Sequence, residues 1–161
     1  MSTYAEALLD FYAVEVQGEA VYSALHGAAK TDAERLRWAT LLQLETETKA
    51  WLRAAMLARG VSVVEDPAER AKGLGAAEQV APLPWTVQMQ ALKGALEGDF
   101  IPRYQGHADA ARARGARDEE ALCLYMVEHE RAQVEFATRE LAGSPHSLEP
   151  IEKFLRYPLR R

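Results

Sequence analysis

Four carboxylates of this sequence fall on the apolar faces of predicted helices. The inward positions of four helical patterns include Glu15, Glu45, Asp99 and Glu130. Within each pair of neighbouring patterns the two acids lie at nearly the same distance from the connecting turn, which predicts that all four meet in one interior region. Buried like charges repel one another and are costly to desolvate. Such a cluster therefore needs metal ions, protonation or a solvent-filled cleft, or internal cations.

A metal site would draw on two further side chains. His129 precedes Glu130 on the inward side of its helix and offers a nitrogen, and Glu19 lies one turn after Glu15. Oxygen-rich sites suit iron or manganese. The candidate metal ligands are Glu15, Glu19, Glu45, Asp99, His129 and Glu130. A single inward histidine is also typical of a hydrogen-bonded core residue, and the pattern assigns no catalytic residue.

Two cations provide a different way to neutralise the acids. Lys49 follows Glu45 by four residues, and Arg103 follows Asp99 by the same interval. Pairs of this spacing with the acid first are favourable on a helix. They predict a buried salt-bridge network in which Lys49 and Arg103 replace the charge of a metal ion, and removal of one partner from such a network costs about 3–5 kcal/mol. In a metal site, the same two residues would orient the ligands.

Four long amphipathic patterns must position these side chains. Helices are predicted over about residues 3–29, 32–59, 84–114 and 118–142, and Pro102 should kink the third or interrupt its hydrogen bonds. Short turns join the first helix to the second and the third to the fourth, so each pair should form an antiparallel hairpin. Residues 60–83 form a long crossover with a short helix around Pro67 to Lys72, and the tail, 144–161, adds another short helix. We therefore expect an all-α fold, a single four-helix-bundle domain over residues 1–161.

Composition and charge exclude several classes of function. The length of 161 residues fits one domain, and the net charge of −5 lacks the basic footprint of nucleic-acid binding. The sequence has neither an apolar stretch long enough to span a membrane nor a signal peptide at its start. With one cysteine, Cys123, we expect a cytoplasmic protein. Leu44 and Trp51 lie off the main apolar stripe, so they either pack against the tail or the crossover or form a homodimer patch. Nothing in the sequence identifies a small-molecule ligand.

Two Gly-acid pairs carry a resemblance to a known family. Gly18-Glu19 and Gly98-Asp99, followed by Tyr22 and Tyr104, resemble the Gly-Glu and Tyr pattern of the ferritin-like superfamily, including its rubrerythrin-like di-iron carboxylate proteins. The resemblance covers about residues 3–142 and implies a ferritin-like four-helix bundle. The family site takes one Glu from each of two helices and a Glu-x-x-His from each of the other two. By this resemblance, Glu15 or Glu19 and Asp99 are the lone carboxylates, and Glu45 and Glu130 are the motif acids.

The sequence departs from the family motif at both histidine positions. Thr48 stands three residues after Glu45, and Gln133 stands three residues after Glu130. Asp99 is also shorter than the Glu of the family, and His129 lies in a different register. These departures favour a metal-free binding or structural module that keeps the fold and a polar mid-bundle site but has no assigned specific function. The alternative is a metal-dependent oxidoreductase that uses iron or manganese.

Overall fold

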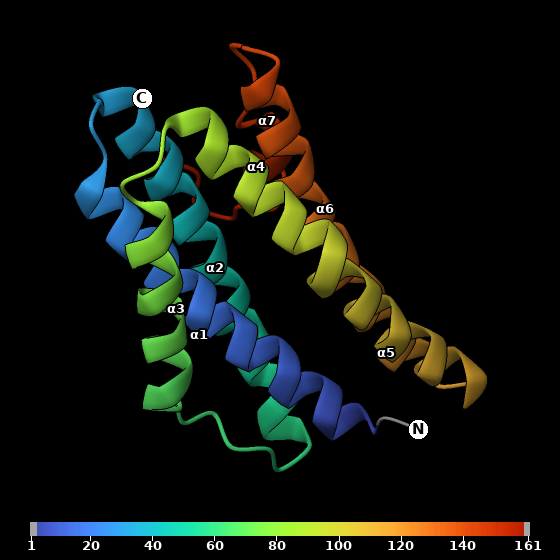
Figure 1. Cartoon of the computed structure of the whole chain (residues 1–161). Coiled ribbons are helices and arrows are strands. Elements are labelled where there is room, and N and C mark those ends of the chain that lie inside the picture. The colour runs from blue at the N-terminus through green and yellow to red at the C-terminus, as the bar shows by residue number, and fades with distance from the viewer. Residues whose placement is uncertain (1–2, 160–161) are drawn as a thin grey trace.

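The structure, a computed structural model, describes residues 3–159, and this part of the chain is all-helical (Figure 1). The ends of the predicted domain and of the predicted tail fall in residues 1–2 and 160–161, which lie outside the described residues. The elements, in chain order, are α1 (Tyr4–Ala28), α2 (Asp32–Ala58), α3 (Pro67–Val80), α4 (Trp85–Ala95), the π-helix η1 (Leu96–Phe100), α5 (Ile101–Ala113), α6 (Arg117–Leu141) and α7 (Glu149–Glu152). The four long helical segments predicted from the sequence are confirmed, with small differences at their ends.

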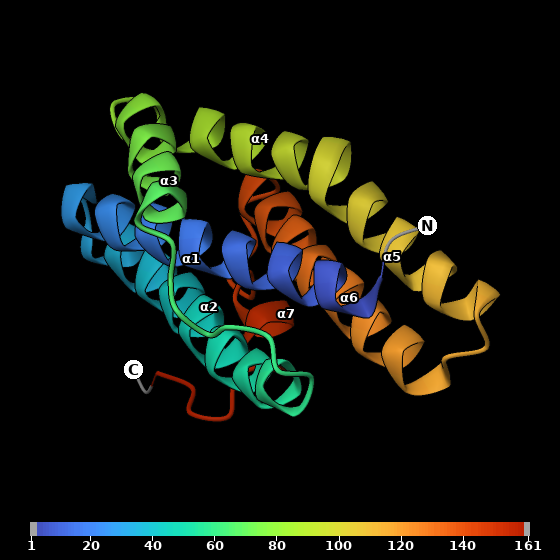
Figure 2. The ribbon, with the colours of Figure 1, turned by 90° about the horizontal axis from the view of Figure 1, so that it is seen from below.

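The long helices form two antiparallel pairs (Figures 1 and 2). The α1–α2 pair begins with a capping box, in which the Thr3 side chain accepts from the backbone N–H of Glu6 and the Glu6 side chain accepts from that of Thr3. Thr31 caps α2 in a similar way by accepting from the backbone N–H of Glu34. In the other pair, α4, η1 and α5 follow one another without a break and run alongside α6. Four different segments therefore reach the middle of the molecule.

The crossover is more ordered than the sequence predicted. Residues 60–83 contain the helix α3, which is longer than the short helix expected around Pro67 to Lys72 and packs along α1 (Figure 1). Asp66 caps it by accepting from the N–H of Ala68, and Pro67 occupies its first turn. Gly73 serves close packing, because a Cβ there would lie 2.3 Å from the backbone oxygen of Gln17. The glycine thus allows close contact between α3 and α1.

Pro102 interrupts the hydrogen-bond pattern of its helix as predicted. The preceding segment is the π-helix η1, and the N–H of Ile101 bonds to the carbonyl of Leu96, five residues earlier. Proline has no N–H to donate, and π-helical turns are a known way to accommodate such a break. The wider turn changes the direction in which the side chains of η1 point. This change explains why the side chain of Asp99 is exposed, as described below.

The interior consists of two apolar clusters with a polar layer between them. One cluster includes Phe11 and Met126, and the other includes Trp38 and Phe136. On α2, Glu45 falls between the residues of the second cluster and those of the first, and on α6 His129 lies between the two clusters in the same way. On α1, Glu15 lies at the end of the first cluster, next to Val16. The apolar clusters stabilise the helices, and together they keep the polar layer away from bulk water.

The tail packs onto the second apolar cluster. It forms the short helix α7, and Leu148, Ile151 and Leu155 are buried in that cluster, as the sequence predicted. Leu44 is also fully buried there, so of its two interpretations the contact with the tail is confirmed and the dimer patch is wrong. Trp51 is 43% exposed and lies against Tyr125, with their ring centroids 4.5 Å apart. Across residues 3–159, no helix combines the length and apolar character needed to cross a membrane.

Candidate metal centre

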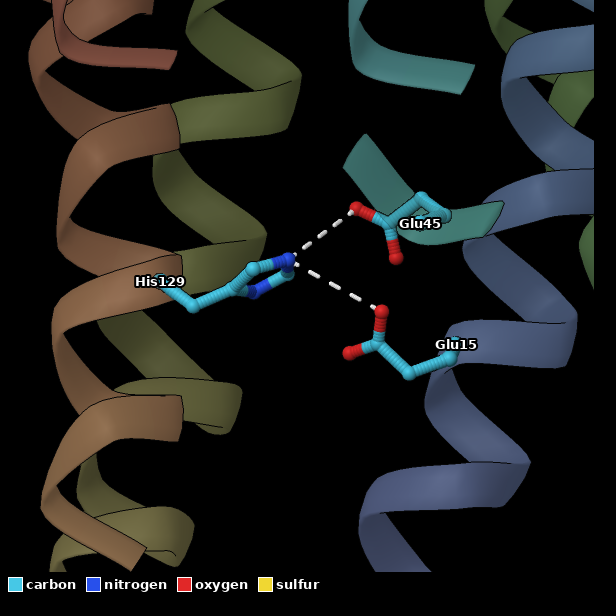
Figure 3. Close-up of side chains that lie close together, drawn as sticks. All are labelled: Glu15, Glu45 and His129. Carbon is cyan, nitrogen blue, oxygen red and sulfur yellow. Dashed lines mark ion pairs between the residues drawn. The ribbon is translucent and has the colours of Figure 1, made fainter. Parts of the chain in front are cut away.

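Three ligand-type side chains from three helices converge in the polar layer. Glu15 comes from α1, Glu45 from α2 and His129 from α6, and Figure 3 shows the two carboxylates facing the same edge of the imidazole ring. The Nε2 atom of His129 lies 3.8 Å from Oε2 of Glu15 and 3.8 Å from Oε1 of Glu45. One ligand atom from each residue lies within 4.8 Å of the other two. Since metal bonds to nitrogen and oxygen are about 2.0–2.2 Å long, one ion can reach all three.

The facing atoms of Glu15 and His129 have no hydrogen-bond partner in the described residues. Neither oxygen of Glu15 accepts a hydrogen bond, and Nε2 of His129 makes none. Both residues are completely buried. Buried polar atoms are nearly always satisfied, and each exception requires an explanation. A cation between these atoms would satisfy all of them at once, so the donor set fits a metal ion.

Glu130 fixes the orientation of the histidine. Its Oε1 lies 3.3 Å from Nδ1 of His129, on the far side of the ring from Glu15 and Glu45. A proton on Nδ1 would be donated to Glu130, which leaves the Nε2 lone pair free for a metal ion. The sequence predicted Glu130 as a direct ligand, whereas the structure places it behind His129. It therefore acts on the candidate centre through the histidine.

Gln133 holds Glu45 in place. Its amide nitrogen donates to Oε1 of Glu45 at 3.0 Å and to Oε2 of Glu130 at 3.5 Å. The Tyr22 hydroxyl in turn donates to the amide oxygen of Gln133. The family motif has histidine at position 133, and here the glutamine links two acids of the cluster. Sequence analysis treated Gln133 only as a missing ligand, and the two carboxylates facing it were the signal for this second role.

The acids of the cluster hold their protons unusually tightly. Burial, together with the charges of Glu45 and Glu130, raises the pKa of Glu15 well above its ordinary value. Burial raises the pKa of Glu45 to about 7, although the positive charge of His129 acts against it. Burial lowers the pKa of His129, but the hydrogen bond to Glu130 and the charges of Glu45 and Glu130 outweigh it and raise the pKa overall. Displacement of these protons by a cation would remove the repulsion.

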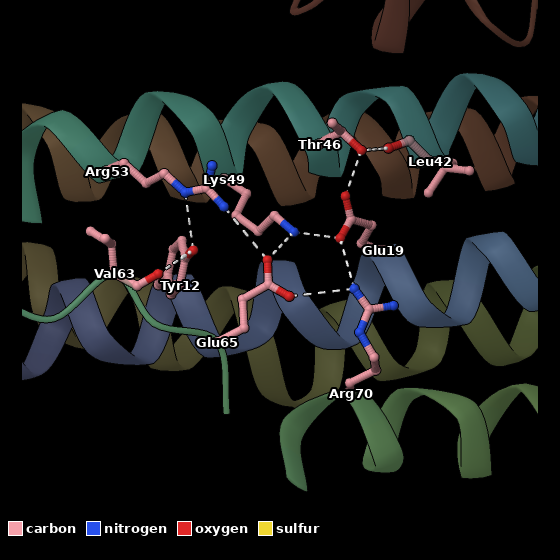
Figure 4. A network of polar contacts seen from close by, with 9 residues as sticks. All are labelled: Tyr12, Glu19, Leu42, Thr46, Lys49, Arg53, Val63, Glu65 and Arg70. Carbon is pink, nitrogen blue, oxygen red and sulfur yellow. Dashed lines mark hydrogen bonds and ion pairs between the residues drawn. The ribbon is translucent and has the colours of Figure 1, made fainter. Parts of the chain in front are cut away.

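Lys49 neutralises a different set of acids. Its Nζ contacts Glu19, and it lies 2.6 Å from Oε1 of Glu65 (Figure 4). Arg70 lies 3.3 Å from Glu19 and 3.4 Å from Glu65, which ties α3 to the same network. The predicted Glu45–Lys49 pair is therefore replaced by pairs across helices, because the long lysine side chain reaches the neighbouring α1. Glu19 belongs to this Lys49 network and lies outside the cluster of Glu15, Glu45 and His129.

Asp99 does not join the cluster, so the prediction that it shares one interior region with the other three acids is wrong. Its side chain is 63% exposed, and Arg103, 3.9 Å away, is its partner. The π-helical turn of η1 explains the error, because the sequence analysis assumed the period of an α-helix throughout. Arg103 also lies 3.4 Å from Asp10, on the outer side of the molecule. Neither predicted cation therefore forms an ion pair with Glu15 or Glu45 in the described residues.

Two other buried side chains of the interior, Cys123 and Tyr104, carry groups that could react or bind. Cys123 is buried in the first apolar cluster, and burial raises the pKa of its thiol to about 11. A protonated core thiol is a poor nucleophile and a poor ligand. The hydroxyl of Tyr104 is buried and has no hydrogen-bond partner in the described residues. The sequence did not predict this unpaired hydroxyl, because the position of a tyrosine on an apolar stripe does not show what surrounds its hydroxyl group.

Comparison with known proteins leaves the family open. No family model, curated protein or solved structure matches the chain. The ferritin-like resemblance therefore stays a prediction. The function is inferred from the geometry of the polar layer.

Proposed function

We propose that this chain is a ferritin-like four-helix bundle that binds iron or manganese and acts as a metal-dependent oxidoreductase. The observation that carries the proposal is the convergence of Glu15, Glu45 and His129 on one buried point, where both oxygens of Glu15 and Nε2 of His129 lack a hydrogen bond. Two carboxylates and one imidazole suit iron or manganese better than softer ions. The proposed centre retains Glu45 of the family motif and takes its nitrogen from His129, in place of the missing histidines at positions 48 and 133.

The charges of the polar layer favour a metal ion over an internal cation. Lys49 and Arg103, the two cations that the sequence offered, are paired with acids outside the cluster. Without metal, the remaining ways to neutralise Glu15 and Glu45 are protonation of these acids, whose pKa values burial raises, and the positive charge of a protonated His129. All of these protons are lost as the pH rises. At higher pH a divalent cation is the better partner for two ionised carboxylates.

The residues of the site have distinct tasks in this proposal. Glu15, Glu45 and His129 bind the ion, Glu130 fixes the ring of His129, and Gln133 fixes Glu45. The apolar clusters on both sides lower the local dielectric. Iron or manganese, when bound, supplies one-electron redox chemistry that the side chains alone lack.

Metal titration of the chelator-treated protein tests this function. We expect ferrous iron or manganese added without oxygen to bind at one ion per chain and to raise the midpoint of thermal unfolding. Glu15→Gln and His129→Ala should each weaken binding by at least about tenfold, since each removes a ligand. Glu128→Gln is the matched control, because Glu128 is exposed on α6 and pairs with Arg131.

A metal-free binding or structural module is the competing function. It draws support from Thr48 and Gln133 at the motif positions, and Gln133 already satisfies Glu45 by a hydrogen bond. If the wild-type protein and the Glu15→Gln variant respond to both ions in the same way, this module is the better description.

A further inference from the structure

A cavity next to the polar layer has the features of a binding pocket. Its volume is about 270 Å³, and its walls come from α1, α3, α4 and η1. The wall residues are mostly apolar, among them Val14, Val21 and Leu92. An apolar cavity of about 150 Å³ is large enough to hold benzene. This cavity therefore has room for a larger apolar molecule.

The buried end of the cavity is polar and belongs to the candidate metal centre. Glu45, Glu130 and Gln133 line it, and each is no more than 2% exposed. Apolar walls with a few convergent polar groups at one end are typical of small-molecule sites. A ligand that filled this cavity would place one end beside Glu45, a proposed metal ligand.

The outer end of the cavity is formed by small side chains. Ala91 and Ala95 are exposed, lie one turn apart on α4 and line the cavity, and the exposed Ala76 on α3 does the same. Larger side chains at these positions would narrow the opening. The cavity thus runs from an entrance between α3 and α4 to the buried acids.

Two glycines are required to keep this arrangement. Gly18 lines the cavity, and a Cβ there would lie 2.5 Å from Oε2 of Glu45, so its absence leaves room for the carboxylate. Gly73 also lines the cavity and allows α3 to approach the backbone of α1. The close approach of α3 brings a wall to the cavity that the two helical pairs alone would not provide.

We propose that this cavity binds a neutral, mainly apolar alcohol whose hydroxyl group points to Glu45 and Glu130. The apolar walls select the body of the molecule, and the two carboxylates accept a hydrogen bond from the hydroxyl. A ligand with a carboxylate head should bind more weakly, because a carboxylate has no hydrogen to donate to Glu45 and Glu130. The binding follows from the cavity alone, whereas the role of the alcohol as a substrate rests on the proposed metal-dependent function.

Calorimetric titration with 1-octanol and octanoate at pH 8 tests the proposal. The two probes share chain length and differ in the charge of the head group. With chelator-treated protein we expect saturable binding of 1-octanol at one molecule per chain, and at least tenfold weaker binding of octanoate. Ala95→Phe and Ala91→Phe fill the entrance from two positions and should each weaken octanol binding at least tenfold. Ala54→Phe, at an exposed position of α2 outside the cavity, should leave it unchanged.

Three outcomes would overturn the proposal: no saturable octanol binding to the wild-type protein, equal binding of octanoate, or unchanged binding to both entrance variants. Circular dichroism identifies any variant that fails to fold, and the second entrance variant then decides. Because the titration uses protein without metal, it fails or succeeds independently of the metal centre. Octanol binding without metal binding would retain the pocket and reject the oxidoreductase.

Discussion

Glu15 is the buried acid with the fewest compensating contacts, so its ionisation should dominate the pH dependence of the metal-free protein. An acid whose pKa is raised by folding stabilises the folded state most below its unfolded value, near 4.5, and that contribution is lost as the pH rises towards the folded value. For Glu45 this window extends from about 4.5 to about 7, and the pKa of Glu15 is raised as well. The free energy of unfolding should therefore fall between pH 5 and pH 8.

Glu15→Gln removes one of these groups and tests this expectation. In the presence of a chelator, the variant should be more stable than the wild type at pH 8, by more than about 1 kcal/mol, and should gain much less at pH 5. Urea unfolding at the two pH values measures the difference, with Glu128→Gln as the exposed control. If the free energy of unfolding depends on pH in the same way for wild type and Glu15→Gln, ionisation of Glu15 does not destabilise the folded state.

Gly18 offers a second test at the scale of single residues. Replacement of glycine by alanine inside a helix normally stabilises a protein by up to about 1 kcal/mol. At position 18 the new Cβ would displace the carboxylate of Glu45, so we expect at least tenfold weaker metal binding from Gly18→Ala. Gly27→Ala in the same helix meets no atom within 4 Å and should leave metal binding unchanged. Equal metal affinities for the two variants would contradict the position assigned to Glu45.

The residues of the site could be predicted only where the helical period is regular. Glu15, Glu45 and His129 lie in uninterrupted α-helices, so their inward direction followed from spacing. Asp99 lies in a π-helical turn, which sequence periodicity does not reveal. The partners of Lys49 and the role of Gln133 depend on contacts between distant segments, and local spacing cannot supply these.

Among the elements, α3 packs along α1 and joins the Lys49 network through Arg70. Burial raises the pKa of Glu19, but the hydrogen bonds from Lys49 and Thr46 outweigh it and lower the pKa overall. The hydrogen bond from Lys49 also lowers the pKa of Glu65. These contributions to stability are present above the ordinary pKa of a glutamate and are lost as the pH falls through the lowered values.

Lys49→Met should destabilise the protein at neutral pH without affecting the metal centre. We expect a loss of about 1–3 kcal/mol in the free energy of unfolding, since charged hydrogen bonds to Glu19 and Glu65 disappear. The difference from wild type should shrink in acid, as urea unfolding from pH 7 to pH 3 would measure. The stabilisation by added manganese should equal that of wild type. A larger metal response in the variant would mean that Lys49 neutralises the buried acids after all.

The order of the long helices was predictable and the crossover was not. Amphipathic patterns, with Gly60 and Gly115 at the helix ends, specified two hairpins. Glycines are typical of loops, and α3 contains two, Gly73 and Gly75. Gly73 instead allows α3 to pack closely against α1. A weakly amphipathic helix whose partner is another backbone leaves little signal in sequence.

For the whole molecule, the exposed aromatic pair Trp51 and Tyr125 keeps the prediction of a homodimer testable. If this pair lies in a dimer interface, Trp51→Glu should dissociate the dimer, because a charge would be buried against an aromatic surface. Light scattering at high protein concentration measures both masses. A monomeric mass for the wild-type protein would reject the homodimer.

The polar layer between two apolar clusters is the central feature of the whole molecule, and anomalous X-ray diffraction tests its meaning most directly. Crystals grown with manganese or ferrous iron would be measured on both sides of the absorption edge of that metal. The account predicts one anomalous peak between Glu15, Glu45 and Nε2 of His129, and its loss in the Glu15→Gln variant. Metal-soaked crystals without a peak at this point, or with a peak that survives the substitution, would contradict the proposed centre.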